Sequence, residues 1–168
     1  MNHSLVISTI ISSMNNVKSY LELGIYEGET FEKVWPIVAQ CTGVDMTDRR
    51  KMKFSGTFHL STTDDFFKNN LEKFDAIFID ADHEFKQVKK DFMRSLDVLN
   101  SDGIIFIHDT DPAKKELIDP GYCGDSYKIV DWIHRTCPEL DCLTLPICDP
   151  GLTIVRMEHG RRILRCLS

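Results

Sequence analysis

The clearest pattern of hydrophobic and polar positions lies in residues 73–112, where it predicts a strand, a helix and a second strand. Residues 74–80 and 104–107 are short apolar runs that end at polar or acidic side chains. Between them, residues 84–99 place apolar side chains three or four positions apart: Phe85, Val88, Phe92, Leu96 and Leu99. We expect residues 100–103 to end this helix in a turn. A crossover helix makes the two strands parallel, so both end at the same edge of the sheet.

The rest of the chain predicts further strands and helices. We expect strands at 19–24, 41–45, 56–60, 141–145 and 152–157, and helices at 2–17, 30–40, 62–71 and 127–135. Pro36 either kinks the second helix or ends it early, and residues 46–53 can hold a turn of helix. The pattern predicts one α/β domain over residues 1–168, with a doubly wound, Rossmann-like, seven-stranded, mostly parallel sheet and an antiparallel last strand. Residues 158–168 are expected to form a flexible tail.

Composition narrows the function classes. The net charge of −6 weighs against sequence-independent binding of nucleic acid. No apolar run approaches the roughly 18 residues of a membrane-spanning helix, so we expect no membrane partner. The six cysteines include no Cys-x-x-Cys pair, and a chain of this size needs no disulfide framework. We interpret them as reduced thiols in a cytoplasmic protein.

The predicted sheet edge after residues 80 and 107 collects acids and imidazoles, and open α/β sheets bind ligands at this edge. They are Asp80, Asp82, His83, His108, Asp109 and Asp111. Crowding four carboxylates is costly unless a cation or a proton-transfer task uses them. Oxygen ligands favour Mg²⁺ or Ca²⁺, and an added imidazole shifts the preference toward Mn²⁺, Fe²⁺ or Zn²⁺. Some of these residues also have simpler interpretations, since Asp80 can cap a strand and Asp82 and Asp111 can be solvated loop acids.

The first strand–loop–helix junction predicts a cofactor site. Gly24 permits a sharp turn, Gly28 opens the next helix, and Asp45 ends the second strand, where dinucleotide folds place an acid on the ribose. The glycine pattern differs from Gly-x-Gly-x-x-Gly. Three glutamates at positions 22, 27 and 29 would repel a pyrophosphate and suit a cofactor with positive charge.

With these pieces in place, the chain resembles the class I S-adenosylmethionine-dependent methyltransferases. The branch it resembles holds metal-dependent catechol-type and sugar or macrolide O-methyltransferases and cephalosporin-hydroxylase-like proteins. The matching segments are Leu-Glu-Leu-Gly-Ile-Tyr-Glu-Gly at 21–28, Val-Asp at 44–45, Phe-Asp-Ala-Ile-Phe-Ile-Asp-Ala-Asp-His at 74–83 and Asp-Gly-Ile-Ile-Phe-Ile-His-Asp-Thr at 102–110. The resemblance covers roughly residues 20–157.

The resemblance implies roles for individual residues. For the cofactor S-adenosylmethionine (SAM), it implies Glu22 and Gly24 at the methionine end, Asp45 on the ribose, Thr63 and Asp64 beside the adenine, and Asp80 nearby. We also expect Gly28 to contact the cofactor, because it opens the helix where a ligand can approach closely. For a divalent metal, Mg²⁺ or Mn²⁺, it implies Asp80, His108 and Asp109. The branch usually has an acid where this chain has His108. The proton of the acceptor hydroxyl would then pass to a base, for which His83 is the first candidate and Asp82 the second.

We therefore expect SAM-dependent methyl transfer to a hydroxyl of a small molecule, with Tyr122 and Tyr127 in the acceptor wall. One alternative is a catalytically silent cofactor-binding or interaction module. The branch that the chain resembles usually carries extra N-terminal helices over the acceptor site, whereas only about 17 residues precede the first expected strand here. A homodimer could supply the missing lid. Another alternative is a nicotinamide-dependent oxidoreductase, against which the glycine pattern argues.

Overall fold

The computed structural model describes residues 2–51, 55–146 and 150–157. One sheet of seven strands forms its centre, in the order β3-β2-β1-β4-β5-β7-β6. The strands are β1 (Ser19–Leu23), β2 (Gln40–Asp45), β3 (Thr57–Leu60), β4 (Phe74–Ile79), β5 (Leu99–His108), β6 (Leu140–Leu145) and β7 (Leu152–Met157). The first five pair in parallel, and β7 runs antiparallel to both β5 and β6. The predicted Rossmann-like sheet, with its reversed last strand, is confirmed.

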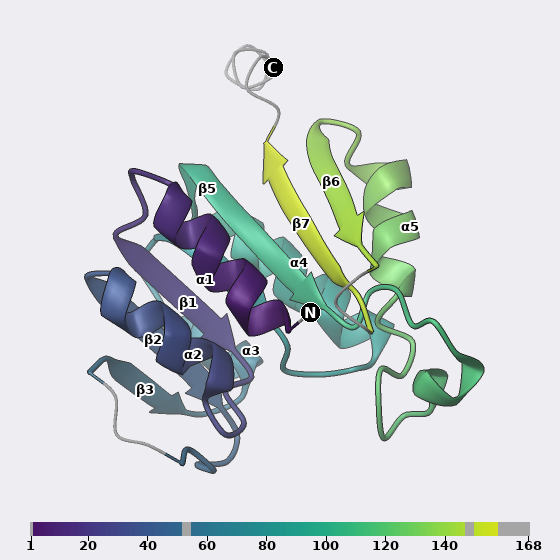
Figure 1. The fold of residues 1–168 in the computed structure, drawn as a ribbon, viewed down its shortest axis with the longest axis horizontal. Coiled ribbons are helices and arrows are strands. Elements are labelled where there is room, and N and C mark those ends of the chain that lie inside the picture. The colour runs from purple at the N-terminus through teal and green to yellow at the C-terminus, as the bar shows by residue number, and fades with distance from the viewer. Residues whose placement is uncertain (1, 52–54, 147–149, 158–168) are drawn as a thin grey trace.

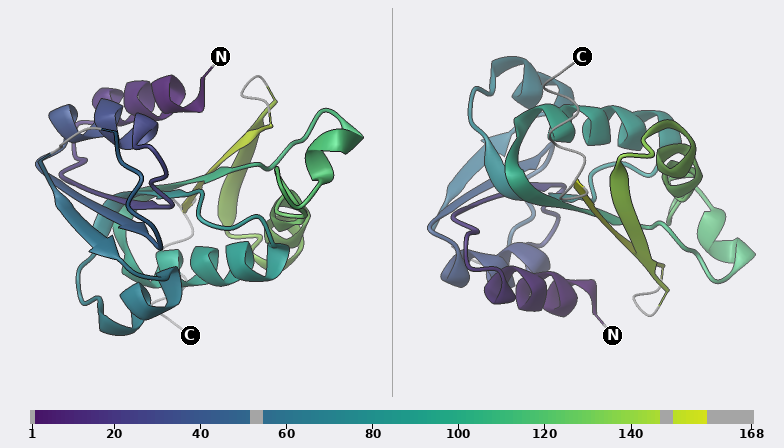
Figure 2. Two further views of the ribbon diagram at one scale, coloured as in Figure 1. Left: turned by 90° about the horizontal axis from the view of Figure 1, so that it is seen from below. Right: turned by 90° about the horizontal axis from the view of Figure 1, so that it is seen from above.

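Helices cover both faces of the sheet (Figures 1 and 2). On one face lie α1 (His3–Ser13), α2 (Glu29–Val34) and the short 3₁₀ helix η1 (Trp35–Ile37). The other face carries α3 (Thr63–Asn69), α4 (Phe85–Val98) and α5 (Lys128–Thr136), and a second 3₁₀ helix, η2 (Lys115–Ile118), lies in the loop before α5. Because the sheet is covered on both faces, the central strands β4 and β5 contain continuous buried apolar runs, at residues 76–79 and 104–107.

Several boundaries differ from the sequence expectation. The helix expected at 30–40 ends at Val34, because Pro36 cannot continue the α-helical hydrogen bonds and enters η1 instead. The first helix ends at Ser13 instead of 17. Residues 46–51 form no helix, and 52–54 lie outside the described residues. The expected tail, 158–168, lies outside them too.

The prediction of a turn at residues 100–103 is wrong, because these residues belong to β5. Pairing with β4 passes from Phe74–Leu99 directly to Ala76–Ile104, so the polar residues form an irregular extension of the strand. The side-chain amide of Asn100 donates a 2.7 Å hydrogen bond to Asp75 of β4, so the Asn100 side chain has a partner on the neighbouring strand. The helix and strand therefore follow one another without a separate loop.

Within the described part of the chain, Cys41, Cys123, Cys137 and Cys142 form no disulfide. Within the part of the chain that the structure describes, no helix combines the length and apolar character needed to cross a membrane.

Candidate active site

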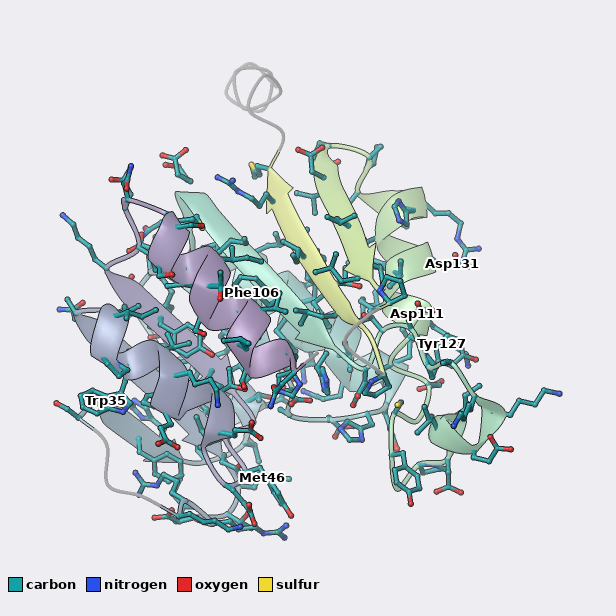
Figure 3. All side chains as sticks on the ribbon, in the orientation of Figure 1. Trp35, Met46, Phe106, Asp111, Tyr127 and Asp131 are labelled. Carbon is teal, nitrogen blue, oxygen red and sulfur yellow. The ribbon has the colours of Figure 1, made fainter. Side chains whose placement is uncertain are left out.

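Two neighbouring cavities open at the carboxyl edge of the parallel strands. Met46 and Asp111, which follow β2 and β5, mark this edge in Figure 3. The larger cavity, of about 680 Å³, is lined by residues that include Gly24, Tyr26, Asp45, Asp80, His83, His108, Asp109, Leu117, Tyr122 and Cys123. The smaller, of about 220 Å³, is lined by Gly24, Val44, Asp45, Met46, Ser61, Thr62, Thr63, Asp64, Ala81, Asp82 and Gln87. Gly24, Asp45, Met46 and Ala81 line both, so the two cavities adjoin.

The loop after β1 is held close to the end of β4. Gly24 has a φ of +85°, and a Cβ atom there would lie 2.2 Å from the carbonyl oxygen of Asp80. Only glycine has no Cβ and adopts this φ without strain, so the sequence requires glycine at this position. The loop thereby brings the ends of β1 and β4 together at the cavities.

Asp45 organises the same loop. Its Oδ2 accepts hydrogen bonds from the backbone N–H groups of Ile25 at 3.0 Å and Tyr26 at 2.8 Å. Its Oδ1 accepts from the backbone N–H of Thr47 at 2.9 Å. The carboxylate therefore fixes the glycine loop and also lines both cavities, where it can accept further hydrogen bonds from a ligand.

The three glutamates near the start of α2 do not supply the cavities with negative charge. Glu22 is 1% exposed, and the Tyr20 hydroxyl donates a hydrogen bond to it. Burial raises the pKa of Glu22 well above its usual value, which favours its neutral form. Glu27 pairs with Lys51, and Glu29 pairs with Lys33. Asp45, Asp80 and Asp109 line the larger cavity instead, and Asp45, Asp64 and Asp82 line the smaller one.

An acid–imidazole cluster lies where β4 and β5 end. His83 Nε2 is 3.1 Å from Asp109 Oδ2, and His108 Nδ1 is 3.1 Å from Asp109 Oδ1 and 3.3 Å from Asp80 Oδ1. Asp80, His83 and Asp109 each offer one ligand atom within 4.8 Å of the others. Asp109 has a φ of +60°, a conformation that residues other than glycine adopt rarely and that is typical of functional sites.

Burial and mutual charge perturb this cluster. Burial raises the pKa of Asp109, and the Asp80 carboxylate raises it further, against the opposing influence of His108 and His83. Burial alone would lower the pKa of His108, but the attraction of Asp80 and Asp109 and a hydrogen bond to Asp80 raise it overall. Two carboxylates this close are stabilised by positive charge between them, from imidazolium or from a cation.

The backbone fixes His83 between α4 and the loop before α5. The backbone N–H of Asp125 donates to the His83 carbonyl at 3.0 Å, and the Asp125 carboxylate accepts from the Phe85 N–H at 2.6 Å. Gly124 lies so close that a Cβ atom there would meet the His83 carbonyl at 2.3 Å. These contacts hold the β4–α4 loop, and His83 with it, at the mouth of the larger cavity.

The cavities bring together most of the residues predicted from the sequence. Gly24, Asp45, Asp80, His83, His108 and Asp109 line the larger cavity, and Thr63, Asp64 and Asp82 line the smaller one. Glu22, Gly28 and Tyr127 line neither, whereas Tyr122 lines the larger. The resemblance implied His108 as the third metal ligand, but the structure groups His83 with the two aspartates.

The sequence reasoning missed several lining residues. Gln87 reaches the smaller cavity from the first turns of α4, and Tyr26, Leu117 and Cys123 contribute to the larger one from loops. His3 of α1 lies beside the cluster, with its ring centroid 4.1 Å from that of His108. Burial and the nearby His108 lower the pKa of His3 to about 4. A signal in the sequence was available for Tyr26, which lies within the glycine loop, and for Met46, another lining residue, which directly follows Asp45.

The residues present fit both a nucleoside cofactor and a divalent cation. The Ser61 hydroxyl, which lines the smaller cavity, is buried and has no hydrogen-bond partner among the described residues. A ligand with polar ring atoms would provide that partner. Two carboxylates and an imidazole within 4.8 Å form a donor set that Mg²⁺ or Mn²⁺ can use.

Comparison with known proteins agrees with this architecture. A family model described as "methyltransferase domain" matches residues 21–110. A methyltransferase from Podospora anserina, solved with S-adenosylhomocysteine (SAH), superposes with a TM-score of 0.74 at 18% identity, covering 93% of this chain and 78% of that one. A Staphylococcus aureus protein assigned as a caffeoyl-CoA O-methyltransferase gives 0.74 at 20% identity, covering 93% and 83%. A Clostridium thermocellum protein assigned as an rRNA methylase gives 0.73 at 12%, covering 94% and 98%. No curated protein matches the sequence.

The order of the strands, the glycine loop and the acids at the strand ends define a class I methyltransferase fold. The family match spans more than half of the chain, so the protein belongs to the methyltransferase domain family. The solved structures differ in acceptor from small molecules to RNA, so the acceptor has to be argued from the site itself.

Proposed function

We propose that this protein transfers the methyl group of SAM to a hydroxyl group of a small molecule, with the help of a divalent cation. The observation that carries the proposal is the position of the Asp80, His83 and Asp109 group in the wall of a 680 Å³ cavity that adjoins the glycine loop. A cofactor and an acceptor bound there would lie next to this acid–imidazole group.

The proposed cofactor residues are Gly24 and Asp45 for the homocysteine and ribose parts, and Thr63 and Asp64 near the base. SAM supplies an electrophilic methyl group on a sulfonium ion. Gly24 leaves room for close approach of a ligand to the backbone, and Asp45 lines both cavities with acceptor oxygens. The SAH-bound Podospora structure supports the same cofactor.

We assign the cation to Asp80 and Asp109, since Mg²⁺ usually needs one or two carboxylates and retains waters. A divalent cation lowers the pKa of a hydroxyl group beside it. His108 contacts both carboxylates through Nδ1 and keeps them in place. His83 lines the larger cavity with these acids, whereas Asp82 lines the smaller one, so we assign the acceptor proton to His83.

A small, partly aromatic acceptor suits the mouth of the larger cavity. Tyr26 and Tyr122 are 60% and 62% exposed there, and Leu117 adds apolar surface. The net charge of −6 disfavours a polyanion such as RNA. The O-methyltransferase assignment of the Staphylococcus structure supports a hydroxyl acceptor. The described cysteines form no disulfide, which suits a reducing compartment, so we propose that the protein works in the cytoplasm.

A screen of hydroxylated small molecules tests the proposal, with SAH formation as the measured product and Mn²⁺ or Mg²⁺ present or removed by a chelator. We expect cation-dependent turnover with at least one catechol, phenol or sugar. In Asp109→Ala, SAH binding should persist while turnover is lost, whereas Asp45→Ala should weaken SAH binding at least about tenfold, as loss of charge-assisted hydrogen bonds does. Unchanged SAH affinity in Asp45→Ala would contradict the cofactor assignment, and full turnover of Asp109→Ala would contradict the cation assignment.

A further inference from the structure

The smaller cavity combines apolar side chains with polar groups, and one of these polar groups, the Gln87 amide, has a fixed orientation. Val44, Met46 and Ala81 are its apolar side chains, and Gln87 reaches it from α4. The cavity adjoins the glycine loop through Gly24. A flat heteroaromatic ring suits such a site, because its faces are apolar and its edge carries donors and acceptors.

The side-chain amide of Gln87 has a fixed orientation. Its Nε2 donates to Asp91 Oδ1 at 3.0 Å and to Thr63 Oγ1 at 3.1 Å. A third contact, to Asp64 Oδ1, is longer at 3.4 Å. An amide nitrogen has two hydrogens, so the two shorter contacts use both of them.

Asp91 determines this orientation. It is 1% exposed, so its carboxylate is buried one helical turn beyond Gln87. Burial raises its pKa to about 6, so at neutral pH it remains a carboxylate that only accepts hydrogen bonds. The Thr63 hydroxyl oxygen has two lone pairs, so it can accept from the Gln87 amide in this orientation. Turning the amide over would place its oxygen against the carboxylate, and two acceptors in contact repel.

The Oε1 oxygen of Gln87 is therefore left for a ligand. It makes no hydrogen bond within the described part of the chain, although Gln87 lines the cavity. The buried Ser61 hydroxyl lines the same cavity and has no partner among the described residues. Among the polar groups of this cavity, which include the carboxylates of Asp45, Asp64 and Asp82, the Gln87 oxygen is an acceptor of fixed orientation and the Ser61 hydroxyl is a donor that lacks a partner among the described residues.

We propose that Gln87 is the residue that selects a 6-aminopurine, with its Oε1 accepting a hydrogen bond from the exocyclic amino group of adenine. Ser61 donates to a ring nitrogen of the same base, and Asp91 is the positioning residue that keeps the amide oxygen toward the ligand. This inference rests on the proposed function, since it assigns the base of the proposed cofactor to this cavity. A 6-oxopurine would bring a carbonyl oxygen against Oε1, so the site should reject it.

Calorimetric titration with SAH and with its 6-oxo counterpart, S-inosylhomocysteine, tests the inference without requiring turnover. The wild type should bind SAH about 10–100-fold more tightly, the usual effect of one mismatched polar contact. Gln87→Leu should bring this ratio close to one, mainly by weakening SAH. Asp91→Asn should lower the ratio as well, because an amide at 91 can donate and allows Gln87 to turn over.

Gln40→Leu is the matched control, because it makes the same chemical change at an exposed position at the start of β2, and it should leave the ratio unchanged. If Gln87→Leu does not fold in a urea titration, Gln87→Met replaces it. An unchanged ratio in a folded Gln87 variant would overturn the inference, as would a wild type that binds both ligands equally. A wild type that binds neither ligand would overturn the proposed function itself.

Discussion

Replacing Gly24 by alanine should destabilise the fold far more than the same replacement at Gly28. Both glycines have left-handed backbone, with φ values of +85° and +90°. They differ in the space around the missing Cβ. At Gly24 that atom would lie 2.2 Å from the Asp80 carbonyl oxygen and 2.7 Å from the Cα of Ala81. At Gly28 its nearest neighbour is the Ile25 side chain at 3.9 Å.

The magnitude follows from two separate costs. A left-handed conformation costs an ordinary L-residue about 1–2 kcal/mol, of which the stiffer unfolded chain of alanine returns about 0.4–1 kcal/mol. Gly28→Ala should therefore lose about 1 kcal/mol. At Gly24 the backbone of the β4 end must also move, and forcing atoms into a packed region typically costs about 1–3 kcal/mol. Gly24→Ala should lose about 2–4 kcal/mol, a large share of the roughly 5–15 kcal/mol that stabilises a domain.

Urea unfolding followed by circular dichroism measures both losses, and SAH titration measures the effect on binding. Because Gly24 lines both cavities, its alanine variant should also bind SAH more weakly, while Gly28→Ala should bind it almost normally. Equal losses of stability in the two variants would refute the argument, since they would show that the close approach of β1 to β4 has no energetic consequence.

Two further predictions concern Asp91 and His83. Because the pKa of Asp91 is raised to about 6, folded protein binds this proton more tightly than unfolded protein, so its contribution to stability falls as pH rises from about 4 to 6. At about 1.36 kcal/mol for each pKa unit, Asp91→Asn should gain about 3 kcal/mol relative to wild type between pH 4 and pH 7 in urea unfolding, and a constant difference would contradict this. His83→Gln should retain Mn²⁺ binding in calorimetry. Its kcat should fall at least about 100-fold, which is the usual contribution of a general base. Loss of Mn²⁺ affinity would contradict this assignment and make His83 a metal ligand.

The hydrophobic pattern predicted the sheet well because parallel strands covered on both faces are continuous apolar runs. It was less successful where polar residues have extended backbone. The sequence of residues 100–103 is typical of a turn. In the structure, the hydrogen bond from the Asn100 side chain to Asp75 stabilises an irregular strand there instead. Pro36 indicated that the second helix is interrupted near this residue, but it did not indicate that the helix ends at Val34.

The site was predicted where residues follow strand ends. Asp45, Asp80 and Asp109 reach the cavities because parallel strands share one carboxyl edge. Interactions that cross between elements could not be inferred from spacing. Asp125 fixes the loop of His83 from a distant segment, and the ion pair of Glu27 with Lys51 removes a charge that the sequence assigned to the cofactor.

Gln87 illustrates the same limit. A glutamine in the first turns of a helix has no distinctive signal in a sequence, and its importance depends on a buried aspartate one turn later and on a threonine from another helix. Only the spatial arrangement shows that its amide has one available orientation.

Calorimetric titration of the protein with SAM, in the presence and absence of Mn²⁺, tests the central claim most directly. We expect saturable binding of SAM under both conditions and a separate Mn²⁺ binding event that Asp109→Ala removes without affecting SAM. Absence of SAM binding under either condition would contradict the account, because the glycine loop and Asp45 would then be elements of structure alone.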